Sequence, residues 1–172
     1  ASNKISIKLG LIYSFFLCFL AFLVLINFNW FTIIMALGSI PLVFAYPLMK
    51  RYTYWPQLFL GITFNYGLIL GWVSVKNGLD IVPIIFYIGA IFWTLGYDTI
   101  YGFQDIKDDE IIGIKSTSIK FKKNPIIFLS ICYSIFTFFT LMTGILMKFN
   151  NLFFIILIMP FLHLFAYQVR SI

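Results

Sequence analysis

The stretch around which this chain is organised runs from residue 97 to residue 117 and reads YDTIYGFQDIKDDEIIGIKST. Five of the six acidic residues of the chain fall within thirteen positions of this stretch: Asp98, Asp105, Asp108, Asp109 and Glu110. Carboxylates are costly near lipid, so acidic residues at the end of an apolar run are candidates for function.

The composition around this stretch is that of a membrane protein. Apolar residues make up 62% of the 172 residues and charged residues 10%, whereas a soluble domain has about 45–50% and about 25%. We therefore expect one integral membrane domain, residues 1–172, in a lipid bilayer. The net charge of +6 is scattered among apolar runs, which argues against a nucleic-acid partner. Nothing in the sequence indicates an oligomeric state.

Six apolar runs are long enough to be transmembrane helices, which need about 20 residues each. They are Ile7–Ile26, Trp30–Met49, Gln57–Val75, Val82–Tyr101, Pro125–Met147 and Leu152–Val169. If the runs alternate in direction, ten of the twelve basic residues fall on one side: Lys4, Lys8, Lys50, Arg51, Lys107, Lys115, Lys120, Lys122, Lys123 and Arg170. This bias predicts that both termini and the acidic stretch are cytoplasmic.

The acidic residues suggest a metal site if the fourth run continues as a helix through Asp109. At 100° per residue, Asp98, Asp105 and Asp109 would form one stripe, with Asp108 about 80° to the side. Like charges four residues apart destabilise a helix by roughly 0.2–0.5 kcal/mol, and a divalent cation would reverse that sign. Two carboxylates with room for substrate phosphates suit Mg²⁺. The alternative is a solvated acidic loop, which does not explain Asp98 inside an apolar run.

Two further groups of polar residues are candidates for binding a phosphorylated substrate. Tyr46, Lys50 and Arg51 close the second run on the acidic side, although such residues also serve as interface anchors. Lys115, with Ser116 and Thr117, offers donors for phosphate oxygens.

One polar residue inside a run and two glycines beside the acidic stretch also stand out. Asn65 lies within the third run, where it either binds substrate or makes an interhelical hydrogen bond. Gly102 and Gly113 would permit bends around the acidic stretch.

These motifs resemble those of a known family. Tyr97–Tyr101, Asp105–Asp109 and Gly113–Thr117 resemble the second aspartate-rich motif of the UbiA-type intramembrane aromatic prenyltransferases. Tyr46–Thr53 is similar to a second signature of that family. Together the two motifs look most like the 4-hydroxybenzoate polyprenyltransferase branch.

The resemblance implies a fold and a reaction. The fold is an all-α, polytopic transmembrane bundle of nine helices around a cavity open to lipid, of which six lie here. The reaction is Mg²⁺-dependent transfer of a polyprenyl group from polyprenyl diphosphate to an aromatic acid, 4-hydroxybenzoate, in ubiquinone biosynthesis. The location implied is a bacterial inner membrane or an organellar inner membrane.

The resemblance also implies roles for individual residues. Asp105 and Asp109 would bind Mg²⁺, while Asp98 and Asp108 would support the metal and the substrate. Tyr46 and Lys50 would stabilise the diphosphate and the allylic cation. The remaining substrate-binding candidates are Arg51, Asn65, Tyr97, Tyr101 and Lys115.

One feature of the family pattern is missing from these 172 residues. The family has an earlier motif, Asn-Asp-x-x-Asp-x-x-x-Asp, and Ala1-Ser2 resembles the end of the loop that follows it. We therefore expect this stretch alone to be inactive.

Two other classes of membrane protein would leave different marks in the sequence. A CDP-alcohol phosphotransferase would carry Asp-Gly-x-x-Ala-Arg, which does not occur here. A non-enzymatic transporter or Mg²⁺-permeating subunit would need polar residues deep in several runs, and the first, fifth and sixth offer little beyond Ser, Thr and His163.

Overall fold

The computed structural model describes residues 6–170, and these residues form helices joined by short connections. Lys4 and the Ala1-Ser2 pair lie outside the described residues. In chain order the elements are α1 (Ile7–Leu25), α2 (Trp30–Tyr52), α3 (Pro56–Lys76), α4 (Ile81–Gly102), α5 (Ile106–Ile112), α6 (Thr117–Phe121), α7 (Pro125–Leu146), α8 (Asn151–His163) and the π-helix η1 (Leu164–Gln168). The expected all-α class is confirmed.

The six predicted spans correspond to α1, α2, α3, α4, α7 and α8 with η1, each long and apolar enough to cross a membrane. One boundary was wrong, because α2 continues through Tyr52 and does not end at Met49. Lys50 and Arg51 therefore lie in its last turn. Cations there interact favourably with the helix dipole, so the charges end the apolar run without ending the helix.

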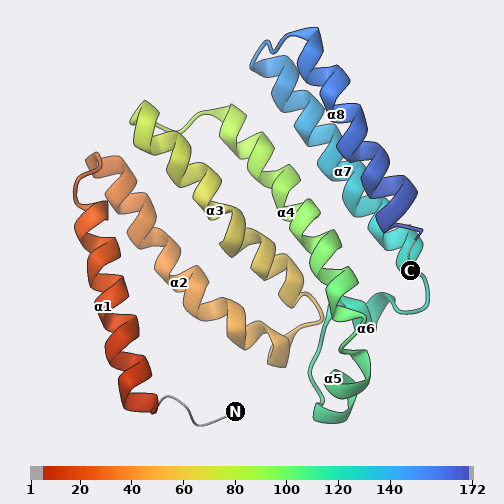
Figure 1. Ribbon diagram of the computed structural model, residues 1–172, viewed down its shortest axis with the longest axis horizontal. Helices are drawn as coiled ribbons and strands as arrows, with labels where there is room; N and C mark the ends of the chain where they lie inside the picture. The colour runs from red at the N-terminus through yellow and green to blue at the C-terminus, as the bar shows by residue number, and fades with distance from the viewer. Residues whose placement is uncertain (1–5, 171–172) are drawn as a thin grey trace.

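The long helices form an open row (Figure 1). α2 packs on α3, α3 on α4, α4 on α7 and α7 on α8. α1 has no buried residue and lies at the outer end of the row. This order makes α4 the central helix, flanked by α3 and α7.

The two ends of the row differ in their connections. α5, α6 and the α2–α3 connection lie at one end, which we call the acidic end, and the α1–α2, α3–α4 and α7–α8 connections lie at the other (Figure 1). Among the described residues, Lys50, Arg51 and Lys115 are therefore at the acidic end, whereas Lys76 and Lys148 are at the opposite end. This arrangement agrees with the predicted division of charge, while the side of the membrane stays a prediction.

Close helix contacts place α4 in this central position. A Cβ atom at Gly61 of α3 would lie 2.9 Å from the carbonyl oxygen of Ile91 on α4. On the other flank, a Cβ atom at Gly96 would lie 2.7 Å from the ring of Tyr133 on α7. Small residues at such points let membrane helices approach closely.

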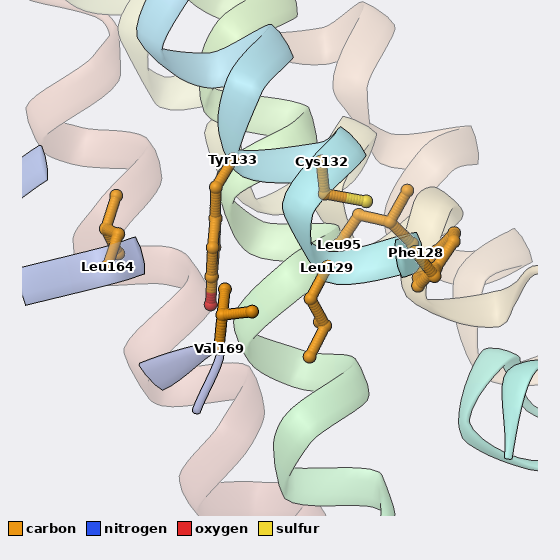
Figure 2. Packing of buried hydrophobic residues seen from close by; sticks show 7 residues of the cluster. All are labelled: Leu95, Phe128, Leu129, Cys132, Tyr133, Leu164 and Val169. Carbon is orange, nitrogen blue, oxygen red and sulfur yellow. The ribbon is translucent and has the colours of Figure 1, made fainter. Parts of the chain in front are cut away.

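The apolar core lies where α4, α7 and the C-terminal helices meet (Figure 2). Its buried residues are Leu95, Phe128, Leu129, Cys132, Tyr133, Leu164 and Val169. The Tyr133 hydroxyl, at the end of a fully buried side chain, donates a hydrogen bond to Gln168 Oε1 at 2.7 Å. This contact ties α7 to η1 and holds the side of the bundle opposite α2 and α3.

Candidate active site

The acidic stretch begins on α4 but does not continue it. α4 ends at Gly102. The next two residues make hydrogen bonds of the 3₁₀ type, in which each N–H donates to the carbonyl three residues earlier: Phe103 N–H to Ile100 O at 3.2 Å and Gln104 N–H to Tyr101 O at 3.1 Å. Such bonds tighten and close a helix end. The expected uninterrupted helix through Asp109 is therefore wrong, and Asp98 does not share one helical stripe with Asp105 and Asp109.

A separate short helix carries the other acidic residues. α5 begins after Asp105, and the Asp109 N–H donates to Asp105 O at 2.9 Å, so these two residues keep the predicted spacing of one turn. Asp105 and Asp108 are exposed and Asp109 is half-buried. The helix ends at Gly113, whose φ of 77° is a left-handed conformation suited to glycine. This bend was predicted correctly.

The second predicted polar group lies beside Asp98. Lys50, in the last turn of α2, interacts electrostatically with the Asp98 carboxylate on α4. Tyr46, one turn earlier on α2, interacts with both Asp98 and Tyr97. Four predicted residues, from two helices that are separated in the row by α3, are thus close enough to interact through space.

An aromatic ladder runs along one face of α4 from these residues to α7. The ring centroids of Tyr101 and Tyr97 are 6.0 Å apart, and those of Tyr97 and Trp93 are 5.0 Å apart. Trp93 in turn lies 6.3 Å from Phe136 of α7. Tyr97 and Tyr101 were predicted site residues and Trp93 was not, although the spacing 93, 97, 101 places all three on one helix face.

Phe136 also lines a large apolar cavity between α3, α4, α7 and α8. Its volume is about 730 Å³, and its wall includes Trp72, Phe86, Phe153 and Phe161. Lys76 and Met147, also in its wall, place it toward the end of the bundle opposite the acidic residues. The ladder therefore connects the polar end of α4 with an apolar space.

Lys115 and Arg51 lie at the same end of the bundle. The Lys115 N–H donates to Lys50 O at 2.9 Å, and its ammonium donates to Tyr52 O at 3.3 Å. Lys115 therefore joins the segment after α5 to the end of α2. Arg51 is exposed in the last turn of α2.

Ser116 and Thr117 differ from expectation. Both are buried; the Ser116 hydroxyl accepts the Ile119 N–H at 3.2 Å as the cap of α6, and the Thr117 hydroxyl lies 2.6 Å from that of Thr99. Buried hydroxyls are not accessible to a phosphate, so of the three predicted residues only Lys115 keeps a side chain that is partly exposed.

Asn65 is buried between α3 and α4. Its amide nitrogen donates to Ala90 O at 3.2 Å and to Thr94 Oγ1 at 2.7 Å. The predicted interhelical hydrogen bond is therefore present. Its role in substrate binding stays a prediction.

The carboxylates fit a cation that shares its ligands with a substrate. In the part of the chain that the structure describes, no three His, Cys, Asp or Glu side chains come close enough to form a metal cage. The only ion pair described within residues 6–170 joins Glu110 to Lys122, so Asp105 and Asp109 are not neutralised by a lysine or arginine. A pair of carboxylates completed by phosphate oxygens and water is the usual protein contribution to Mg²⁺ binding.

The fold and the site together define a polytopic membrane protein with a carboxylate-bearing segment at one end and an apolar, aromatic-lined cavity toward the other. The family model described as the UbiA prenyltransferase family matches residues 1–172. The chain belongs to that family. This membership argues against the phosphotransferase and the transporter interpretations.

Individual relatives agree with this assignment. Over 106 residues, or 61% of this chain, it is 52% identical to the mitochondrial 4-hydroxybenzoate polyprenyltransferase of Rattus norvegicus and covers 28% of that protein. The human protein of the same name is 50% identical over 106 residues, 61% of this chain and 29% of its own length. The 4-hydroxybenzoate geranyltransferase 2 of Lithospermum erythrorhizon is 48% identical over 124 residues, 70% of this chain and 40% of its own length.

The chain thus spans well under half the length of these relatives. No solved structure gives a significant match.

Proposed function

We propose that the full-length protein containing this chain transfers a polyprenyl group from polyprenyl diphosphate to 4-hydroxybenzoate, with Mg²⁺ as cofactor. The observation that carries this proposal is that Lys50 and Tyr46 of α2 lie at the same end of the bundle as Asp98 and Tyr97 of α4, close enough for their charges to interact through space. The positive charge of Lys50, which suits a diphosphate, would thereby lie near one end of the aromatic ladder on α4. The other end of the ladder contacts Phe136, in the wall of the apolar cavity. The names of the relatives support the choice of acceptor.

The acidic end would hold the diphosphate. Asp105 and Asp109 would bind Mg²⁺, and the bound ion supplies neutralisation of charge on the leaving diphosphate. Asp98 and Asp108 would orient this arrangement. The ammonium groups of Lys50 and Lys115 add charge-assisted donors for phosphate oxygens, and Arg51 is near enough along α2 to contribute another.

The interior would hold the prenyl chain and protect the reacting carbon. As the bond to the diphosphate breaks, positive charge develops on the allylic carbon, and aromatic faces stabilise a nearby cation. Tyr46, Tyr97, Trp93 and Tyr101 supply such faces. The apolar cavity of about 730 Å³ is within the size range of ligand pockets and would take a stretch of the isoprenoid.

The acceptor ring would then attack at the carbon next to its hydroxyl, where it is most electron-rich, and lose the ring proton. We place the reaction in ubiquinone biosynthesis, in a bacterial inner membrane or an organellar inner membrane. The basic residues of the acidic end support a cytoplasmic orientation of the site.

The test is an assay of the full-length protein with a polyprenyl diphosphate and 4-hydroxybenzoate. We expect a prenylated aromatic product, detected by chromatography and mass spectrometry, that disappears with EDTA and returns when Mg²⁺ is added in excess. A well-folded preparation that makes no metal-dependent product from these substrates would reject the proposal.

A further inference from the structure

We propose that four buried polar residues, Gln57, Thr99, Thr117 and Ser118, position the acidic segment and thereby set the affinity of its carboxylates for a divalent cation. We call these four residues the anchoring network, and residues 103–115 the acidic segment. The statement about the cation rests on the proposed function, whereas the statement about position does not.

Beyond Phe103, which packs against the core at its start, the acidic segment has little packing of its own. None of the seven residues of α5 is buried. The ion pair between Glu110 and Lys122 is exposed on both sides, and exposed pairs contribute about 0–1 kcal/mol. The place of the segment is therefore decided where its two ends meet the bundle.

The anchoring network lies at both ends of the segment. Thr99 and Gly102 precede the segment on α4, and Thr117 and Ser118 follow it on α6. Ser118 Oγ donates to Thr99 O at 2.8 Å, and the Thr117 N–H donates to Gln57 Oε1 at 3.0 Å. Thr99, Thr117 and Ser118 are fully buried, and Gln57 is 5% exposed.

The direction of the remaining hydrogen bond follows from counting protons. Thr99 Oγ1 donates to Leu95 O at 2.6 Å. A hydroxyl has one proton to donate, so Thr99 accepts in its 2.6 Å contact with Thr117, and Thr117 is the donor. Loss of the Thr117 hydroxyl therefore removes the hydrogen bond between Thr117 and Thr99, which joins the two ends of the segment. The hydrogen bond from Thr99 to Leu95 O within α4 is kept.

Gly102 makes the close approach of the two ends possible. A Cβ atom on Gly102 would collide with Ser118 Oγ and lie 3.5 Å from Gln57 Nε2. The ends of the segment are thus held together by residues that lie outside it. Every hydrogen bond of the anchoring network joins two protein groups. The network can therefore hold the two ends of the segment together without a bound substrate.

The network also connects the segment to the cationic side of the site. Lys115, directly before Ser116, donates its N–H to Lys50 O at 2.9 Å. Thr117 is two residues after Lys115, so a shift of Thr117 would disturb this hydrogen bond. The carboxylates of the segment would then change position relative to both Lys50 and Asp98. A pair of carboxylates that must share a cation with a substrate loses affinity when its position is no longer fixed.

The first test measures position without metal or substrate. In EDTA, amide hydrogen exchange of residues 103–115 in the full-length protein should be roughly tenfold faster in Thr117→Val, because a buried hydrogen bond is lost. Thr117→Ser should restore the wild-type rate, since it keeps the donor. The matched control is Thr137→Val, whose hydroxyl bonds only within α7, to Tyr133 O at 2.8 Å.

The second test measures the Mg²⁺ concentration for half-maximal prenyl transfer. We expect it to rise several-fold in Thr117→Val and not in Thr117→Ser or Thr137→Val. If Thr117→Val does not fold, Thr99→Val removes the acceptor of the same bond. Unchanged exchange in a folded network variant, or faster exchange with unchanged Mg²⁺ dependence, overturns the inference. If the wild-type protein makes no product, the proposed function fails, and the exchange experiment still decides the anchoring.

Discussion

Within residues 6–170, the Asp105 side chain makes no interaction that would stabilise the fold. Asp105 precedes α5 at the N-cap position, yet its side chain makes no capping hydrogen bond and is exposed. It also faces Asp109 at one helical turn, a repulsive spacing. A carboxylate that does not support the fold is free to bind a ligand.

We therefore predict that Asp105→Ala lowers kcat/KM for prenyl transfer by roughly a hundredfold or more, the usual scale for losing one group that stabilises developing charge. The thermal unfolding midpoint should not fall, because no hydrogen bond is lost. The control is Glu110→Gln, which removes a nearby acidic charge paired only with an exposed lysine. Near-wild-type turnover of Asp105→Ala would remove this residue from the site.

At the scale of elements, α3 offers two glycines with opposite environments. Gly61 lies against the backbone of Ile91 on α4, whereas nothing lies within 4 Å of a Cβ atom at Gly67. Glycine lowers helix stability by about 0.5–1 kcal/mol relative to alanine. The first glycine must therefore be explained by packing and the second need not be.

Gly61→Ala should destabilise the protein by about 1–3 kcal/mol, the usual cost of overpacking. Gly67→Ala should be neutral or stabilising, by up to about 1 kcal/mol. Both can be compared by thermal unfolding in detergent, followed by circular dichroism. Equal midpoints for the two variants would contradict the close packing of α3 on α4.

At the scale of the whole molecule, the connections divide between two ends of an open row (Figure 1). Lys123 belongs to the acidic end, between α6 and α7, and Leu79 belongs to the opposite end, between α3 and α4. Both are exposed. If the row crosses a bilayer, the two positions face different compartments.

Single cysteines at these positions should thus react from opposite sides. In a full-length protein without other cysteines, with Cys18→Ser and Cys132→Ala among the replacements, a membrane-impermeant maleimide should label Leu79→Cys in intact bacterial cells. Lys123→Cys should be labelled only after permeabilisation, because the basic end stays in the cytoplasm. The reverse pattern would place the acidic segment on the outer side and refute the predicted orientation.

Much of the fold could be predicted because hydropathy is a local property. Apolar runs of about 20 residues require helices in lipid, since backbone groups must be satisfied within the segment. The helix bounds are harder to predict: Lys50 and Arg51 interrupt the apolar run, but a helix tolerates cations in its last turn and α2 continues through them. The residue types at the site were equally visible, because clustered carboxylates in an apolar chain need a reason.

Six spans, the division of charge between the two ends and the kinds of side chain at the acidic end all follow from the residues read in order. Three features needed the packed helices: α4 ends at Gly102, Ser116 and Thr117 are buried, and Lys50 is within electrostatic range of Asp98. The reason is the range of the interactions. Hydropathy and charge act within one helix, whereas the bonds that position the acidic segment join residues 18 and 60 positions apart.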